Sequence, residues 1–350
     1  MQYTIHDCIE TTPNIAVLKY WGKRDVARNL PANSSISLTL DSQFSTHTLC
    51  ISYPSAKSIE LYLNGSREDL SERHKKVISE LSKRCDKFGE KLFKGVIYSR
   101  NSFPSACGLA SSASGAAAFV LALSSTLKTP LNSEEIVDLV RLCSGSGVRS
   151  LMGNWVHWNR GEGVMSSISP IKSEIRPEII VYLIESQQKK VPSAKGMGLS
   201  AETSPLYQQR INFVAPHHET KFMMALISND WNSFCETVIA DCESFVEVCE
   251  STVPPLNYQN ELAKSVFNFI KLKNKDLDER FAVTFDAGSN PFIFTKSGKS
   301  QEIIDILEAE MPELKQYKRY VLRSGEGPCV RLISDSFKEE IDRFMTKYLQ

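Results

Sequence analysis

The chain contains 350 residues, a length that predicts either two domains or one large two-lobed unit with a substantial hydrophobic core. Hydrophobic residues make up 42% of it and charged residues 23%, and these fractions exclude collagen, coiled-coil and mucin-like proteins. Because 41 basic residues balance 41 acidic ones, the overall charge favours neither nucleic acid nor an anionic membrane as a partner. Any anion-binding site must therefore be local.

Targeting and membrane signals are not apparent in the sequence. No stretch approaches the ~18 consecutive apolar residues of a spanning helix, and residues 1–10 lack the basic start and apolar run of a signal peptide. The nine cysteines are odd in number and scattered, which is typical of free thiols in a reducing compartment. We therefore expect a cytoplasmic protein.

The first half alternates short apolar segments with turn residues. Strands are predicted at residues 15–18, 36–40, 59–63 and 96–98. The third of these enters a tight turn at Asn64-Gly65, because both residues tolerate positive φ at low cost. Helices are predicted over residues 67–93, 116–123 and 133–142. Ser133 is placed to cap the last of them.

The second half begins after a polar break at residues 187–193. We place the domain boundary there, with an N-terminal domain over residues 1–187 and a C-terminal domain over 188–350. A strand at residues 179–184 precedes the break. Beyond it, helical patterns at residues 221–249, 262–274 and 302–310 are interleaved with strands at 281–285, 292–295 and 330–333.

A loop of small residues, 108–115, is the strongest local signal. Its backbone amides can approach a ligand closely, and the helix that follows places partial positive charge at its first turn, so phosphate oxygens suit this place. The serines at 111, 112 and 114 add hydroxyl donors, and a hydroxyl can also reach a magnesium ion that bridges phosphates. A helix start that merely lets two elements pack closely explains the same pattern equally well.

Two further segments carry cations. Lys19 and Lys23 follow an apolar strand and flank Tyr20 and Trp21, which can wall a small pocket, although cations at a strand end are usually solvated. The segment Ser144-Gly145-Ser146 precedes Arg149, whose guanidinium can bind phosphate or carboxylate through paired donors. A turn with an exposed arginine is the alternative interpretation of this second segment.

Asp286 ends an apolar strand where the chain must turn. An aspartate there often only caps the turn. If it faces a pocket lined by Lys19 and Arg149, it becomes a candidate base for a hydroxyl group.

Cys235, Cys242 and Cys249 are spaced as a buried helical stripe, and residues 217–219 are interpreted as surface polarity.

In this order, the segments resemble the mevalonate diphosphate decarboxylases of the GHMP kinase superfamily over nearly the whole chain. Residues 14–25, continuing into 30–37, are similar to the family signature and are the most specific part. Residues 101–104 leading into 108–115 resemble the superfamily's ATP phosphate loop. Residues 144–149, 190–197 and 286–288 complete the set.

The resemblance implies an α+β, two-lobed GHMP kinase-like fold with the active site in the cleft between the lobes. It implies that mevalonate 5-diphosphate and ATP, with Mg²⁺, yield isopentenyl diphosphate, ADP, phosphate and CO₂ for isoprenoid and sterol synthesis, in an enzyme that is commonly a homodimer. It implies catalytic roles for Asp286, Lys19, Arg149 and Asn14. It implies substrate binding by Tyr20, Trp21, Lys23, Ser144, Ser146 and Ser193. It implies nucleotide binding by Asn101, Gly108, Leu109, Ala110, Ser111, Ser112 and Ser114, with Ser112 as the candidate metal contact.

The sequence departs from the family pattern at three places. Thr12 stands where the signature opens with alanine, Ser289 where it has proline, and Val246 where it has histidine. The last change puts in question the pocket wall that the second half contributes. The alternatives are a related small-molecule kinase, a phosphomevalonate decarboxylase, or a non-catalytic regulator that binds ATP and metabolite. The presence of Asp286, Lys19 and Arg149 together argues against the regulator, since a sensor does not need a base.

Overall fold

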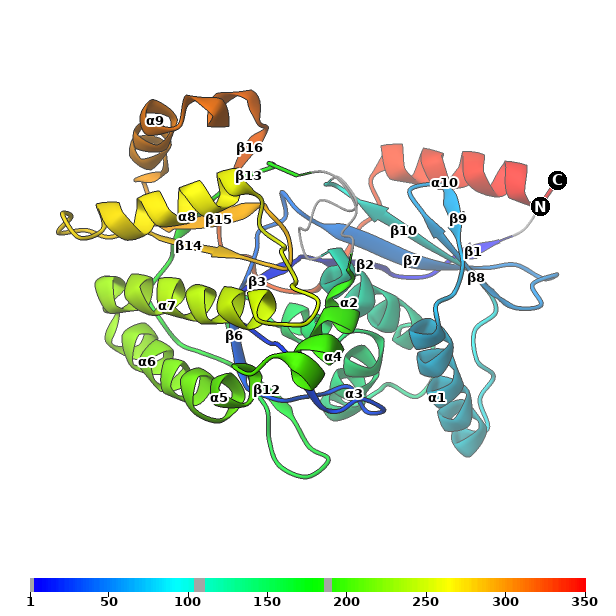
Figure 1. Ribbon diagram of the computed structural model, residues 1–350. Helices are drawn as coiled ribbons and strands as arrows, with labels where there is room; N and C mark the ends of the chain where they lie inside the picture. Colours follow the sequence, from blue (N-terminus) through cyan, green and yellow to red (C-terminus); the bar gives the residue numbers. More distant parts are fainter. Residues whose placement is uncertain (1–2, 104–110, 186–190) are drawn as a thin grey trace.

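The structure is a computed structural model that describes residues 3–103, 111–185 and 191–350 (Figure 1). Among these residues the first sheet has the order β17 (Cys329–Arg331), β2 (Cys8–Thr11), β7 (Thr46–Ser52), β10 (Gly95–Asn101), β8 (Ile59–Leu63) and β9 (Ser66–Glu68), with β1 (Thr4–Ile5) paired to β7. The second has the order β12 (Ser167–Pro170), β11 (Trp155–Asn159), β6 (Ser35–Thr39) and β3 (Asn14–Leu18). The third has the order β14 (Ala282–Phe285), β15 (Pro291–Thr295), β13 (Glu178–Tyr182) and β16 (Arg319–Leu322). A hairpin joins β4 (Lys23–Asp25) to β5 (Leu30–Pro31).

Helices pack against these sheets. Those of the first half are α1 (Glu72–Phe88), α2 (Ser111–Ser124), α3 (Ser133–Cys143) and the 3₁₀ helix η1 (Gly145–Leu151). Those of the second half are α4 (Ser193–Thr203), α5 (Tyr207–Gln209), the π-helical turn η2 (Arg210–Val214), α6 (Ala215–Ser228), α7 (Trp231–Glu250), α8 (Glu261–Lys273), α9 (Ser300–Glu310), the 3₁₀ helix η3 (Pro312–Gln316) and α10 (Asp335–Tyr348).

The first sheet is covered on both faces. Helix α10 buries Phe337, Ile341 and Met345, spaced four residues apart, against β7 and β10. Helices α1, α2 and α3 share a second hydrophobic cluster with the same sheet. The predicted turn between β8 and β9 is confirmed, because Asn64 and Gly65 have φ of 50° and 80°.

The helices of the first half differ from the prediction in their bounds or caps. Helix α2 spans 111–124 rather than 116–123. Helix α1 spans 72–88, not 67–93, because Ser71 caps its start and Gly89 ends it in the left-handed conformation with φ of 66°. Helix α3 is capped by Asn132 rather than Ser133. The Asn132 side chain accepts a hydrogen bond from the Glu135 amide at 2.9 Å, while the Glu135 carboxylate accepts one from the Asn132 amide at 2.8 Å.

The predicted helix over residues 221–249 is wrong as a single element. Asn229 adopts a left-handed φ of 58° and ends α6, and Asp230 then caps α7 by accepting a hydrogen bond from the Ser233 amide. Helix α7 lies between α6 and the third sheet, as Figure 1 shows, and contacts β3 and β14. Its buried cysteines, Cys235, Cys242 and Cys249, form the predicted stripe.

The last strand and helix return to the first sheet. β17 pairs with β2 in antiparallel register, with Val330 opposite Ile9, and α10 follows it. The predicted boundary at residues 187/188 lies outside the described residues, and the division into two domains stays a prediction. Residues 324–328 lead into β17.

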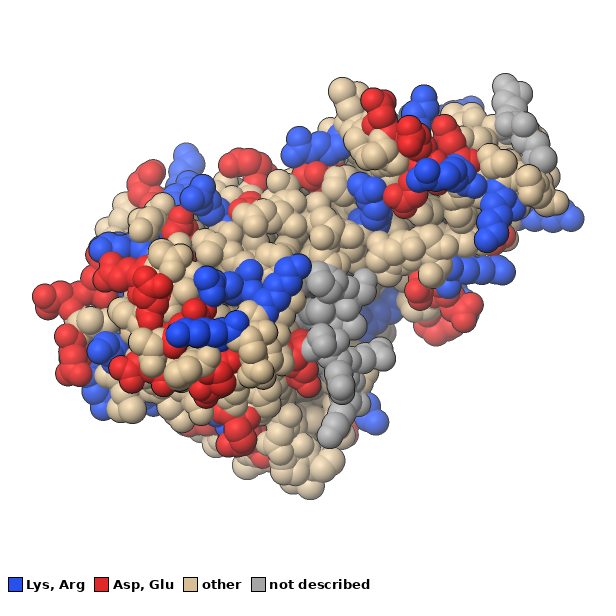
Figure 2. Space-filling model, turned by 90° about the horizontal axis from the view of Figure 1, so that it is seen from above, with Lys and Arg blue, Asp and Glu red and all other residues tan. Residues whose placement is uncertain are grey.

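The surface carries no dominant charge on the face that Figure 2 shows, where acidic and basic side chains are interspersed. This agrees with the net charge of zero. Within the described ranges, we find no helix that is both long and apolar enough to cross a membrane.

Candidate active site

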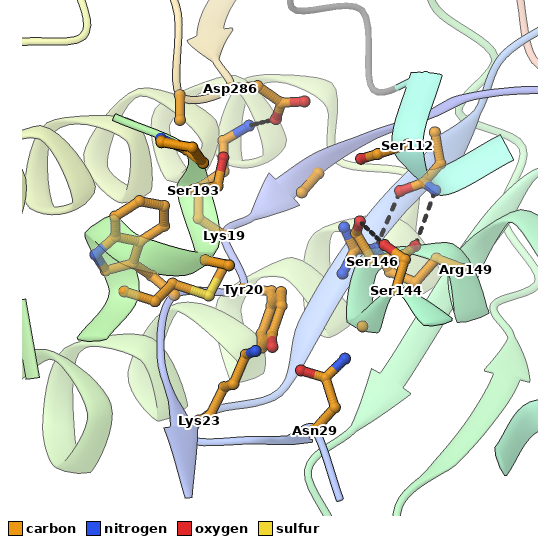
Figure 3. Close-up of a pocket in the computed structure, with 18 of the residues that line it drawn as sticks. Lys19, Tyr20, Lys23, Asn29, Ser112, Ser144, Ser146, Arg149, Ser193 and Asp286 are labelled. Atoms are coloured by element: carbon orange, nitrogen blue, oxygen red, sulfur yellow. Dashed lines mark hydrogen bonds and ion pairs between the residues drawn. The ribbon is translucent and has the colours of Figure 1, made fainter. Parts of the chain in front are cut away.

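A cavity of about 490 Å³ lies where the end of β3, the starts of α1, α2 and α4, η1 and the end of β14 come together (Figure 3). Its charged lining residues within the described ranges are four cations, Lys19, Lys23, Arg73 and Arg149, and one carboxylate, Asp286. The cavity therefore concentrates a charge of plus three (4 − 1 = 3) in a chain whose net charge is zero. Such a site attracts a polyanion.

Lys19 leaves the buried strand β3 and directs its ammonium to Asp286. The Nζ–Oδ1 distance is 3.1 Å, and the side chains of Lys19 and Asp286 are 4% and 25% exposed. Asp286 is thus partly open to the cavity while its partner is buried. The aspartate therefore does not merely cap its own turn but faces the cavity that Lys19 and Arg149 also line.

The turn that carries Asp286 is tied by hydrogen bonds. The Gly288 amide donates to the Asp286 carbonyl at 2.7 Å. Ser289, which stands where the family has proline, donates to Glu185 at 2.8 Å and accepts from the Asn260 amide at 3.1 Å. A hydroxyl network therefore holds the turn that a proline ring would otherwise restrict.

Arg149 is held in a fixed orientation on η1. Its Nε donates to Asn14 Oδ1 at 3.1 Å and its Nη1 to Ser35 Oγ at 2.8 Å, whereas its Nη2 has no hydrogen-bond partner among the described residues. Burial lowers the pKa of Arg149 to about 10, partly opposed by the charge of Asp286 and by Tyr20. A bound anion would compensate this desolvation.

Tyr20 and Lys23 line the far part of the cavity from Asp286 in Figure 3. Burial raises the pKa of the Tyr20 phenol, so it stays a donor, and its hydroxyl has no partner within the described ranges. Gly145 leaves room for it, since a Cβ there would lie 2.9 Å from the Tyr20 hydroxyl. Burial and the charge of Arg73 lower the pKa of Lys23.

Helix α4 and Trp21 form an apolar wall. The Trp21 indole donates to Ser200 Oγ at 3.0 Å, which fixes the ring against α4. Ser193 and Met197 of α4 and Phe245 of α7 also line the cavity.

The predicted site residues converge to a large extent. Those that line this cavity are Asn14, Lys19, Tyr20, Trp21, Lys23, Ser112, Ser144, Ser146, Arg149, Ser193 and Asp286. Asn101 does not line it but lies at the end of β10, where its Oδ1 accepts from Thr46. Ser114 is buried and bonded to Thr46 Oγ1 at 2.9 Å. Gly108, Leu109 and Ala110 lie outside the described residues, as does the side chain of Ser111, which begins α2.

Several lining residues were missed by the sequence analysis. Ser71 and Arg73 come from the start of α1, and Asn29 from the β4–β5 turn. Arg73 stands in a charged stretch that is typical of a solvated helix surface, so the sequence carried no signal that separates it from its neighbours. Val246, at the histidine position of the family, is outside this lining and borders a smaller cavity between α7 and α8.

The interpretation of residues 217–219 as surface polarity is wrong for His218. His218 is buried, 8% exposed, and bonds Asp241 at 3.1 Å, and Glu219 bonds the ring of His157 at 2.7 Å. The reason is that α6 turns these residues toward α7 and β11, which a local sequence window does not show.

Comparisons with known proteins cover almost the whole chain. Residues 11–169 match the family described as the diphosphomevalonate decarboxylase-like N-terminal domain, and residues 179–346 match the mevalonate 5-diphosphate decarboxylase C-terminal domain. The chain belongs to the diphosphomevalonate decarboxylase family. A diphosphomevalonate decarboxylase of Ganoderma lucidum is 32% identical over 353 residues, covering 94% of this chain and 88% of the relative.

Solved structures of this family share the fold. Mevalonate diphosphate decarboxylase from Trypanosoma brucei aligns with a TM-score of 0.84 at 28% identity, over 95% of this chain and 99% of that one. MDDEF in complex with MVAPP, AMPPCP and magnesium aligns with a TM-score of 0.83 at 25% identity, over 94% and 99%. The predicted α+β, GHMP kinase-like fold of the diphosphomevalonate decarboxylases is thereby confirmed.

Proposed function

We propose that the protein catalyses the ATP-dependent decarboxylation of mevalonate 5-diphosphate to isopentenyl diphosphate, with release of ADP, phosphate and CO₂. The product is a precursor for isoprenoid synthesis. The observation that carries the proposal is the 3.1 Å pair between Lys19 and Asp286 in a cavity whose other charged lining residues in the described ranges are cations. Such a cavity binds a polyanion and keeps one carboxylate for a hydroxyl group.

The diphosphate end of the substrate is assigned to the part of the cavity that holds Tyr20, Lys23, Ser144 and Ser146. These residues supply two kinds of donor that phosphate oxygens accept, an ammonium and hydroxyl groups. Arg73 adds a charge at the same cavity. The tertiary hydroxyl is assigned to the opposite end, beside Asp286.

Asp286 orients and deprotonates that hydroxyl as the hydroxyl oxygen attacks the γ-phosphorus of ATP and the bond to ADP breaks. The phosphorylated oxygen then leaves with the electron pair of its bond to carbon, and the electrons of the bond to the carboxyl group form the new double bond as CO₂ departs. Arg149 binds the carboxylate through its unpaired Nη2 and holds it in line for this step, with Asn14 fixing the guanidinium at 3.1 Å. Alignment is the main contribution of these groups.

Mg²⁺ fits the residues that line the cavity. The solved structure of a relative in complex with MVAPP, AMPPCP and magnesium supports ATP and Mg²⁺ as ligands of this protein. The cavity offers Asp286 and the Ser112 hydroxyl as oxygen donors, and the described residues contain no group of three or more His, Cys, Asp or Glu side chains that could hold a metal. Magnesium usually keeps several waters and binds one or two protein oxygens plus substrate phosphates. When bound, it would neutralise charge on the transferred phosphoryl group.

The homodimer, the cytoplasmic location and a role in sterol synthesis are carried over from the family resemblance and stay predictions. Size-exclusion chromatography with light scattering checks whether the protein is a homodimer.

The test of the proposed function compares two substrates. The purified protein is given ATP and Mg²⁺ with either mevalonate 5-diphosphate or mevalonate 5-phosphate, and ADP, phosphate and CO₂ are measured in parallel. We expect the three products in equal amounts with the diphosphate and little turnover of the monophosphate. ADP without phosphate and CO₂ would indicate a kinase, preferred turnover of the monophosphate a phosphomevalonate decarboxylase, and binding without products a regulator.

A further inference from the structure

A buried ionic cluster lies behind the cavity, outside its lining. Asp241 of α7 is fully buried, and its carboxylate accepts from Arg210 of η2 at 2.9 and 3.1 Å and bonds His218 of α6 at 3.1 Å. Burial alone would raise the pKa of Asp241, but Arg210, His218 and a backbone amide hold it below its usual value. Charges this deeply buried persist only where they are paired, so the cluster is a rigid unit.

The backbone amide in this cluster belongs to Lys19. It donates to Asp241 Oδ2 at 2.8 Å. The carbonyl of Lys19 accepts from Asn33 Nδ2 at 3.0 Å and from Arg210 Nη2 at 3.5 Å. Both polar groups of Lys19's own backbone are therefore anchored by side chains, one of which reaches across from α7.

The anchoring occurs where β3 has already ended. Lys19 is the first residue beyond β3, so the sheet no longer fixes its position. Its ammonium must nevertheless lie 3.1 Å from the carboxylate of Asp286. Asp286 is carried by a separate segment, the turn after β14. An error of about 1 Å in the position of such a group is enough to cost about 10²-fold in rate.

We propose that Asp241 is a positioning residue that holds Lys19, through its backbone amide, in the place where its ammonium pairs with Asp286. The inference rests on the proposed function, because it assigns Asp241 to the same reaction. Arg210 and His218 hold the carboxylate in turn. Asp241 does not touch the substrate and acts through Lys19.

The test contrasts two substitutions of the same residue. Asp241→Asn keeps an oxygen acceptor for the Lys19 amide, whereas Asp241→Ala removes it, and both leave Arg210 without its counter-charge. We expect both variants to melt at lower temperature. We expect kcat to fall at least 10-fold in Asp241→Ala and to stay within about threefold of wild type in Asp241→Asn, with KM for both substrates changed less than about threefold.

Val238→Ala on the same helix is the matched control. Val238 is fully buried on α7, so the truncation lowers the melting temperature by leaving a cavity, and we expect kcat to be unchanged. If Asp241 has only a structural role, kcat will follow the melting temperature in all three variants. That result would overturn the proposal.

A double-mutant cycle with Lys19→Ala separates the two roles further. If Asp241 acts through Lys19, adding Asp241→Ala to Lys19→Ala lowers kcat no further. The same fold-reduction in both backgrounds would overturn the inference. Should Asp241→Ala not fold, Arg210→Met is added to both Asp241 variants, which removes the buried cation, and the comparison is repeated.

Failure of this inference is distinguishable from failure of the proposed function. Wild-type protein that releases no CO₂ from mevalonate 5-diphosphate contradicts the function itself. Wild-type turnover together with a folded Asp241→Ala variant of unchanged kcat contradicts only the positioning role.

Discussion

Asp286 is the carboxylate on which the proposed chemistry depends. Asp286→Asn keeps the size of the side chain and removes the charge that pairs with Lys19 at 3.1 Å. We expect kcat to fall by at least about 10²-fold, equivalent to about 2.7 kcal/mol, because the amide cannot take the hydroxyl proton. CO₂ release measures the effect, and fluorescence titration with ATP checks that nucleotide binding survives.

The control for this substitution is Asp276→Asn, which changes an exposed aspartate in the loop after α8. It should leave kcat unchanged. Activity of Asp286→Asn within about threefold of wild type would remove the assigned role.

We expect Lys23 to set the alkaline limit of activity. Burial and the charge of Arg73 lower its pKa, so its ammonium is lost at lower pH than that of an ordinary lysine. The charged form prevails below the shifted pKa. In the proposed assignment this form binds the diphosphate, so we expect affinity to decline as pH rises through the pKa. We expect kcat/KM for mevalonate 5-diphosphate to fall on the alkaline side below pH 10.5, the ordinary lysine value.

Lys23→Arg tests this assignment, because a guanidinium keeps its charge to higher pH than an ammonium. The alkaline limb of kcat/KM should move upward in this variant, while kcat at saturating substrate changes less. If the alkaline limb of kcat/KM lies at the same pH in Lys23→Arg as in wild type, the titrating group is not Lys23.

In the turn after β14, hydrogen bonds of Ser289 take over the stabilising role of the proline that the family has at this position. Ser289 donates to Glu185, accepts from the Asn260 amide and also bonds the Tyr258 carbonyl at 3.0 Å. Ser289→Ala removes these bonds in a buried place, so we expect a loss of about 1–3 kcal/mol in the free energy of unfolding, measured by urea denaturation. Because Asp286 shares this turn, kcat should fall as well.

Ser300→Ala, at the start of α9 and remote from the cavity, is the comparison for Ser289→Ala. It should leave kcat unchanged. A Ser289→Ala protein with wild-type stability and kcat would contradict the role of the hydroxyl.

The elements that the sequence predicted are those with a local cause. The Asn64-Gly65 turn follows from two residues that accept positive φ, and the apolar segments of β3, β6 and β8 lie within two residues of their predicted bounds. The break between α6 and α7 also has a local cause, at Asn229, but the apolar periodicity on both sides of it favours one continuous helix. Competing local signals of this kind decide boundaries poorly.

The features that the sequence did not reveal depend on contacts between distant segments. The pairing of β17 with β2 joins residues more than 300 positions apart, and no local pattern specifies it. The same holds for the burial of His218, which depends on Asp241 of another helix. The site residues, by contrast, were found because the motifs resemble a family, whereas Arg73 belongs to none of the motifs that carried their assignment.

The whole molecule is electrically neutral, yet the described charged residues that line the cavity are four cations and one carboxylate, contributed by both halves of the chain. A polyanion that fills this cavity should therefore stabilise the whole fold. At a ligand concentration of 100 Kd the stabilisation is about 2.7 kcal/mol. For a chain of 350 residues, an unfolding entropy of about 0.7 kcal/mol/K converts this to a rise of about 4 °C in Tm.

Differential scanning fluorimetry with mevalonate 5-diphosphate measures this rise, and mevalonate without phosphate is the control at the same concentration. We expect the rise only with the diphosphate, since the cations are what the ligand neutralises. At a fixed ligand concentration, the rise in Tm should become smaller when NaCl is increased from 50 to 500 mM, because this change shortens the Debye length roughly threefold. An equal rise with unphosphorylated mevalonate, or one that salt does not affect, would mean that the confined charge does not drive binding.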